Sequence, residues 1–146
     1  MRTKLSVADL RGLTDEPIVA VLATNRADGT TMLSPVWFEW DGAAVTIWSH
    51  GWTDGKVRHL QRDPRATVVV AEQTMPLRGF EVTGRASLTT DGFHDTMRRI
   101  SARYAGEEVA DAMVKEYVEP GVLIRIEPTR LRAWDFADDA GDDPTA

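Results

Sequence analysis

The stretch PIVAVLATNRADGTTMLSPVWFEWDGAAVTIWS, residues 17–49, decides how this chain folds. It contains three runs of β-branched and other apolar residues, separated by RADGT at residues 26–30 and by the pair Asp41-Gly42. Apolar runs that are bounded by Asp-Gly pairs are typical of β-hairpins. We therefore predict three adjacent antiparallel strands in the first third of the chain.

The rest of the chain continues in the same manner. The pattern predicts short helices after Ser6 and over residues 55–62, strands over 65–72 and 77–89, helices over 92–104 and 106–117, and two short strands around Pro128. Strands dominate, and the helices fall where they can cover the ends of a barrel. We therefore predict a mainly β protein with helices, an α+β fold built on a closed or nearly closed antiparallel barrel.

Length and composition limit the possible classes of protein. The chain has 146 residues, of which 42% are hydrophobic, and this is enough for one domain with its own core. We assign residues 1–136 to a single domain and expect the acidic residues 137–146 to form a disordered tail. The absence of cysteine excludes disulfides, thiol nucleophiles and cysteine-ligated metals.

Charge and hydropathy bear on partners and location. The formal net charge of −6 argues against a nucleic-acid surface, which needs clustered basic residues, although a small anionic ligand remains compatible. No apolar run approaches the roughly 20 residues that cross a bilayer, and the first residues lack the features of a secretion signal. We therefore expect a cytoplasmic protein that does not enter a membrane.

Hydroxyl and basic side chains gather in TIWSHGWTDGKVRHLQRDP, residues 46–64, where the third strand gives way to a helix. A helix N-terminus offers unpaired N–H groups and a favourable dipole to an anion. Ser49 and Thr53 add hydroxyl donors, and Lys56 and Arg58 add positive charge. The pattern fits an anion site, but it also fits an ordinary surface helix whose cations are simply solvated.

The order of these motifs resembles the split β-barrel oxidoreductases that bind flavins or deazaflavins, the group similar to pyridoxamine 5′-phosphate oxidase. The resemblance covers about residues 17–132 and rests on SPVWF at 34–38, Lys-x-Arg-x-Leu at 56–60 and Asp-Pro-Arg at 63–65. It implies an antiparallel split β-barrel of six or seven strands, of the FMN-binding type. It also implies a homodimer in which each cofactor site lies at the subunit interface.

The resemblance also implies which residues bind the cofactor. The phosphate would lie against Ser49, Thr53, Lys56 and Arg58, and the ring along the backbone of Ser34, Pro35, Val36 and Trp37. Trp52 would line or cover the site, and Gln73 and Arg78 would reach across from the second subunit. Asp54 stands where related proteins often have a basic residue, and an acid beside a phosphate is unfavourable.

Other aromatic and histidine residues receive structural interpretations. We expect Trp40 and Trp48 to belong to the barrel core and His94 to face solvent. The three histidines lack metal-ligand spacing, so we predict no metal site. We assign no catalytic side chain, because flavins and deazaflavins bring the hydride chemistry with them.

The implied function is that of an oxidoreductase dependent on the deazaflavin coenzyme F420. The segments SPVWFEWDG and GKVRHLQRDPRATVVV are more similar to the deazaflavin-dependent branch than to true pyridoxamine-phosphate oxidases. Such an enzyme would transfer a hydride between F420 and a conjugated acceptor such as a quinone or a tetrapyrrole. Two alternatives stay open: an oxidoreductase that uses FMN, and a protein that stores F420 without turnover. A substrate cavity lined by Trp52 and the helical pair would favour the enzyme.

Overall fold

The computed structural model describes residues 5–136, and within them seven strands form one antiparallel sheet. The strands are β1 (Ala20–Asn25), β2 (Thr31–Val36), β3 (Phe38–Trp40), β4 (Val45–Ser49), β5 (Arg65–Ala71), β6 (Gly79–Thr89) and β7 (Val122–Trp134). The helices are α1 (Gly55–Arg62), α2 (Phe93–Ala105) and α3 (Glu107–Glu116), with 3-10 turns at Val7–Leu10 and Leu13–Asp15. The predicted α+β split barrel is confirmed, and the expected tail of residues 137–146 lies outside the described residues.

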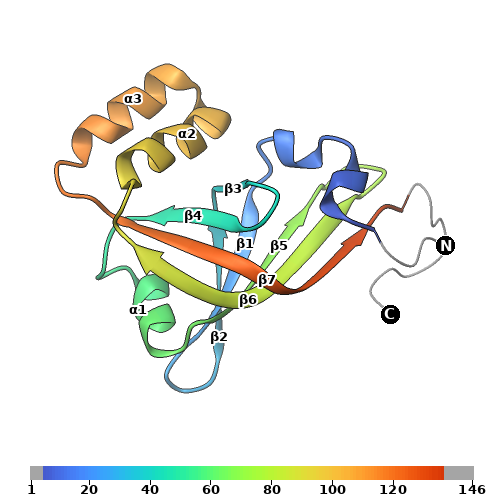
Figure 1. Ribbon diagram of the computed structural model, residues 1–146, viewed down its shortest axis with the longest axis horizontal. Helices are drawn as coiled ribbons and strands as arrows, with labels where there is room; N and C mark the ends of the chain where they lie inside the picture. The colour runs from blue at the N-terminus through green and yellow to red at the C-terminus, as the bar shows by residue number, and fades with distance from the viewer. Residues whose placement is uncertain (1–4, 137–146) are drawn as a thin grey trace.

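The order of the strands explains why the sheet curls. The order is β2-β1-β5-β6-β7-β4-β3, so β2 and β3 stand at opposite ends of the sheet. In the sequence, however, only Trp37 separates these two strands. The two ends of the sheet are therefore joined at this residue, and the sheet curls into a split barrel (Figure 1).

The prediction of three adjacent strands is correct about the two turns and wrong about which strands are neighbours in the sheet. Both hairpins form: Leu22 of β1 faces Ser34 of β2, and Glu39 of β3 faces Thr46 of β4. The expected second strand breaks at Trp37, and β4 continues the sheet through β7. Pairing between strands that are distant in sequence places β4 across the barrel from β1.

The end of the chain also differs from the prediction. Instead of two short strands, Val122–Trp134 form one long strand that pairs with β6 along its length. The register shifts between Thr83, which faces Arg130, and Gly84, which faces Pro128. Proline has no N–H for the ladder, and the irregularity accommodates it without ending the strand. A Cβ at Gly84 would lie 2.1 Å from the carbonyl oxygen of Glu127, so only glycine fits at this crossing.

The core fills the inside of the curled sheet, and helices cover its openings. Alternate residues of the strands point inward, among them the fully buried Leu22, Val68 and Ile124. Helix α1 buries Val57 and Leu60, and the α2–α3 hairpin packs beside β4 through a second cluster around Phe93 and Met97 (Figure 1). Within residues 5–136, no helix has the length and apolar character needed to span a membrane.

Candidate functional site

A cavity of about 450 Å³ opens where the β2–β3 bend, the end of β4, the start of α1 and helix α3 come together. It is lined by Val19, Pro35, Val36, Trp37, Trp48, Ser49, His50, Lys56 and Met113. Small-molecule sites in proteins have this size and this mixture of apolar walls with a few polar groups. A second hollow of about 510 Å³ is lined by Arg99 and Arg125, which are paired with Glu39 and Asp41, and it contains none of the predicted site residues.

The first wall of the cavity is the bend between β2 and β3. Pro35 lies on β2, an end strand that pairs only with β1 among the described residues, so its missing N–H leaves no ladder incomplete. The ring of Trp37 stacks parallel on Tyr104 of α2, with ring centroids 5.0 Å apart. The Tyr104 hydroxyl donates a 2.7 Å hydrogen bond to the carbonyl of Ile18. Stacking and this hydrogen bond together fix the position of the wall.

The opposite wall is an aromatic cluster. Trp48 packs edge-on against Phe93 and Tyr117, and the His50 ring stacks on Tyr117 and bonds its hydroxyl through Nδ1. Burial raises the pKa of the Tyr117 hydroxyl, and the Glu116 and Asp54 carboxylates raise it further. The buried indole N–H of Trp48 has no hydrogen-bond partner among the described residues. An unsatisfied buried donor at a cavity wall suits a ligand oxygen.

Lys56 brings the positive charge to the cavity. Its ammonium donates a 2.7 Å hydrogen bond to the carboxylate of Asp54, and both side chains are largely buried, at 15% and 16% exposure. Asp54 is the residue that precedes α1, yet its side chain makes no capping hydrogen bond to the helix. The carboxylate is therefore turned to Lys56 instead of to the backbone N–H groups of the helix.

Five of the predicted site residues line this cavity: Pro35, Val36, Trp37, Ser49 and Lys56. Ser34 lies next to them on β2 and is half-buried. The buried hydroxyl of Ser49 donates to the carbonyl of Val122 at 3.0 Å, so its one proton is already used within the barrel. The structure therefore brings the expected ring wall and the expected lysine to one place.

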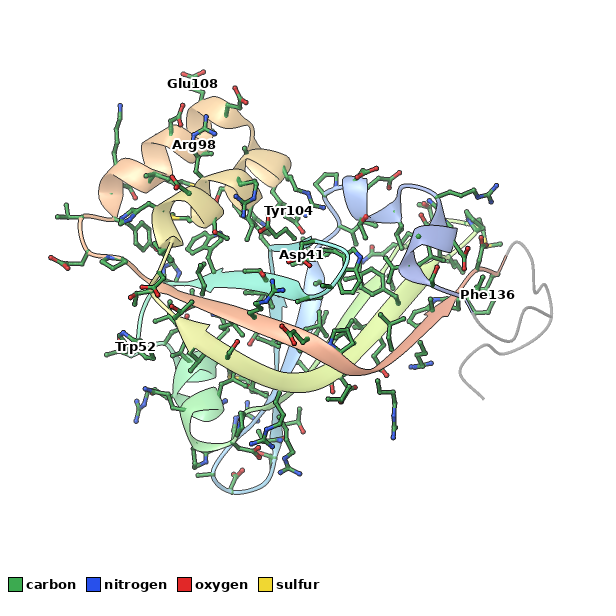
Figure 2. The ribbon with its side chains drawn as sticks, viewed as in Figure 1. Asp41, Trp52, Arg98, Tyr104, Glu108 and Phe136 are labelled. Carbon is green, nitrogen blue, oxygen red and sulfur yellow. The ribbon has the colours of Figure 1, made fainter. Side chains whose placement is uncertain are left out.

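The other predicted residues lie outside the cavity lining. Trp52 is 46% exposed and projects beside α1 (Figure 2), and Thr53 and Arg58 are exposed as well. Gln73 lines a separate hollow of about 310 Å³, which shares Val19 with the cavity. Arg78 bonds Glu72 at 2.8 Å and the carbonyl of Leu10 at 2.6 Å, so its contacts are made within its own chain.

Two expectations about aromatic and histidine residues need correction. Trp40 packs against Phe80 beside the core, as expected, but Trp48 lines the cavity. His94 does not simply face solvent, because its Nε2 donates a 2.6 Å hydrogen bond to the carbonyl of Tyr117. In both cases the partners come from the α2–α3 hairpin and the residues that follow it, whose docking beside β4 no local pattern predicts.

Sequence reasoning missed four lining residues: Val19, Trp48, His50 and Met113. Trp48 and His50 lie within or beside the segment that drew attention to the site, so their position was a usable signal. No such signal distinguishes Met113, because its spacing in the predicted helix fits a core contact equally well. Within residues 5–136 no group of histidine and acidic side chains is arranged to hold a metal ion.

The family model for pyridoxamine 5′-phosphate oxidase matches residues 7–135. This chain belongs to that family. The family comprises flavin-binding oxidoreductases, and in this chain the aromatic side chains, the end strand β2 and Lys56 meet at one cavity. Among curated proteins, none matches the sequence.

Solved structures of similar proteins share the fold over most of the chain. A conserved hypothetical protein of Mycobacterium tuberculosis is 23% identical, with a TM-score of 0.79 over 95% of this chain and 90% of that one. An F420 reductase is 27% identical, with a TM-score of 0.65 over 82% and 93% of the two chains. A FAD-binding protein of Mesorhizobium loti is 20% identical, with a TM-score of 0.61 over 88% and 92%.

Proposed function

We propose that this protein is an F420-dependent oxidoreductase that transfers a hydride between the coenzyme and a conjugated organic acceptor, such as a quinone or a tetrapyrrole. The observation that carries the proposal is the cavity in which an aromatic bend, an end strand and Lys56 meet. The similarity to an F420 reductase at 27% identity supports the deazaflavin over other cofactors of the family.

The protein's own part in this function is to bind, orient and shield. When bound, a deazaflavin supplies the hydride chemistry. The unpaired edge of β2 offers backbone N–H and C=O groups to the polar edge of a ring, and Trp37 and Trp48 exclude water from its faces. Lys56 supplies a charge-assisted hydrogen bond to the coenzyme's phosphodiester.

FMN remains the alternative cofactor, and storage of F420 without turnover remains the alternative role. The similarity to a FAD-binding protein keeps flavins in consideration. Met113 places helix α3 on the cavity wall, as expected for the acceptor pocket of an enzyme, whereas Trp52, the other residue expected there, lies outside the lining.

Fluorescence titration of the protein with F420 and with FMN tests the cofactor. We expect F420 to bind more tightly. Tighter binding of FMN would move the protein to the flavin branch, and failure of both would remove the redox function altogether. Turnover with quinone and tetrapyrrole acceptors then separates an enzyme from a storage protein.

We further propose that the protein is a homodimer, with the partner covering the outer face of β1 and β2. Leu33 of β2 is 67% exposed there, opposite Ala23 of β1, and Val19 at the start of the same hairpin is also exposed. Exposed apolar side chains gathered on an end strand mark an interaction surface. Because Val19 also lines the cavity, a partner on this face would help to close the site, and Gln73 and Arg78 of that partner are the side chains proposed to reach it.

A charge placed at Leu33 tests the dimer. We expect Leu33→Glu to shift the protein from dimer to monomer at micromolar concentration in sedimentation velocity, and to weaken cofactor binding in parallel. The matched control is Val118→Glu, at an even more exposed valine after α3, which should stay dimeric. A monomeric wild type that binds its cofactor fully would refute the shared site.

A further inference from the structure

The ion pair between Lys56 and Asp54 leaves the cavity with little net positive charge. Of the side chains that line the cavity, only those of Lys56 and His50 are ionisable. Lys56 is already 2.7 Å from Asp54, and Arg58, two positions further along α1, is exposed and faces another direction. An anion that enters the cavity therefore meets a lysine whose charge is shared with a carboxylate.

We propose that Asp54 makes the site selective for a singly charged phosphodiester over a doubly charged phosphomonoester. This inference rests on the proposed function, and it names the residue that would set the choice between F420, whose phosphate is a diester, and FMN, whose phosphate is a monoester. Asp54 acts here as a specificity-determining residue that touches the cofactor only through Lys56.

The geometry makes the second charge of the monoester costly. Lys56 lines the cavity and Asp54 does not, so an anion in the cavity contacts the ammonium while the carboxylate stays bonded to it from outside the lining. With 2.7 Å on the Asp54 side and about 2.8 Å for a charge-assisted contact to the ligand, the two anionic oxygens lie at most about 5.5 Å apart. At an effective dielectric constant of about 40, each unit of ligand charge then changes the affinity by about tenfold.

The Asp54 carboxylate also acts on Tyr117, the partner of His50. Tyr117, on the opposite wall, has a pKa that is raised by burial first, then by Glu116 and by Asp54.

The substitution Asp54→Asn removes this charge and keeps the size and shape of the side chain. The Asp54 side chain makes no capping hydrogen bond to α1, and asparagine is favoured as strongly as aspartate at the position before a helix. The control is Glu108→Gln at the exposed start of α3 (Figure 2). It changes the net charge by the same amount, at a position away from the cavity.

Three flavins with the same ring and different charge are the probes. At pH 8, riboflavin carries no phosphate charge, riboflavin 4′,5′-cyclic phosphate carries one and FMN carries two, because the second pKa of a phosphomonoester is about 6. Dissociation constants from flavin fluorescence, together with those for F420, are compared between the wild type and the two variants. We expect Asp54→Asn to strengthen FMN binding about tenfold more than cyclic-phosphate binding and to leave riboflavin unchanged, with no such difference in Glu108→Gln.

The remaining outcomes overturn the proposal in distinguishable ways. Equal changes for the two phosphates, or none, would mean that Asp54 does not select by charge, although F420 binding would stand. If none of the three flavins binds to the wild type or to Asp54→Asn while F420 still binds, the protein selects its cofactor by the ring system and not by the charge of the phosphate. Failure of F420 and of every flavin would remove the proposed function itself.

Discussion

Lys56 and Arg78 are both largely buried cations beside a carboxylate, yet they lie in regions of different character. Arg78, between β5 and β6, uses its guanidinium nitrogens on Glu72 and on the carbonyls of Leu10 and Arg11. Within residues 5–136, Lys56 donates a hydrogen bond to Asp54 alone, and it borders a cavity. A cation whose donors are all used within the chain holds the fold together, whereas a cation with donors to spare beside open space can hold a ligand.

The largest expected effect comes from removing Arg78. The substitution Arg78→Leu leaves Glu72, at 9% exposure, without its cation, and we expect the free energy of unfolding to fall by about 3 kcal/mol. Urea unfolding of the apo protein measures this change. The control is Arg98→Leu, whose exposed pair with Asp111 should cost about 1 kcal/mol or less. If Arg78→Leu instead weakens cofactor binding at unchanged stability, the contrast with Lys56 fails and the role of Arg78 at the subunit interface stands.

The next effect concerns Lys56 and should appear in binding. Losing a charge-assisted contact to a phosphate costs about 1.5–3 kcal/mol, so Lys56→Ala should weaken cofactor binding by at least tenfold. Its effect on stability should be about 1 kcal/mol or less, because Asp54 can turn back to cap α1. Titration at two salt concentrations and an apo thermal melt measure the two quantities, with Lys115→Ala on exposed α3 as the control. A loss of affinity no larger than the loss of stability would make Lys56 an ordinary structural lysine.

The smallest effect belongs to an exposed pair, Asp41 with Arg125, which contact at 2.7 Å. The hydrogen bond from Arg125 lowers the pKa of Asp41 from 3.8 to about 2, although burial acts in the opposite direction. Hydrogen bonds from the amides of Ala43 and Ala44 lower the pKa further. Because the pKa of Asp41 is lower in the folded protein than in the unfolded chain, the ionised carboxylate stabilises the fold at pH values above about 4. This stabilisation is lost as the pH falls from about 4 to about 2.

We therefore expect Asp41→Asn to be less stable than the wild type at pH 7 by less than about 1 kcal/mol, since the pair is exposed and screened by salt. The difference should vanish near pH 2, as followed by urea unfolding across the acid range. A difference that persists at pH 2 would show that the turn hydrogen bonds to Ala43 and Ala44, and not the ion pair, are responsible.

The sequence predicts the local parts of this molecule better than their arrangement. Apolar runs and Asp-Gly turns predict the two hairpins because those signals act over a few residues. The break at Trp37 and the continuous strand through Pro128 depend on which distant strands become neighbours, and local periodicity carries no such information.

The site divides in the same way. Pro35, Trp37 and Lys56 were predictable because proline in an edge strand and a lysine at a helix start have recognisable local causes. Trp48 and Met113 meet only after the α2–α3 hairpin docks beside β4, and no spacing within either segment indicates that contact.

The single residue that joins the two ends of the sheet has one further consequence. An end strand such as β2 presents unpaired backbone groups, and in other proteins these are sites of aggregation between molecules. Here the chain turns at Trp37 into the other end strand, so the break in the ladder opens onto the cavity. The same bend thus joins the two ends of the sheet and forms one wall of the cavity, so an insertion beside Trp37 would compromise the barrel and the site at once.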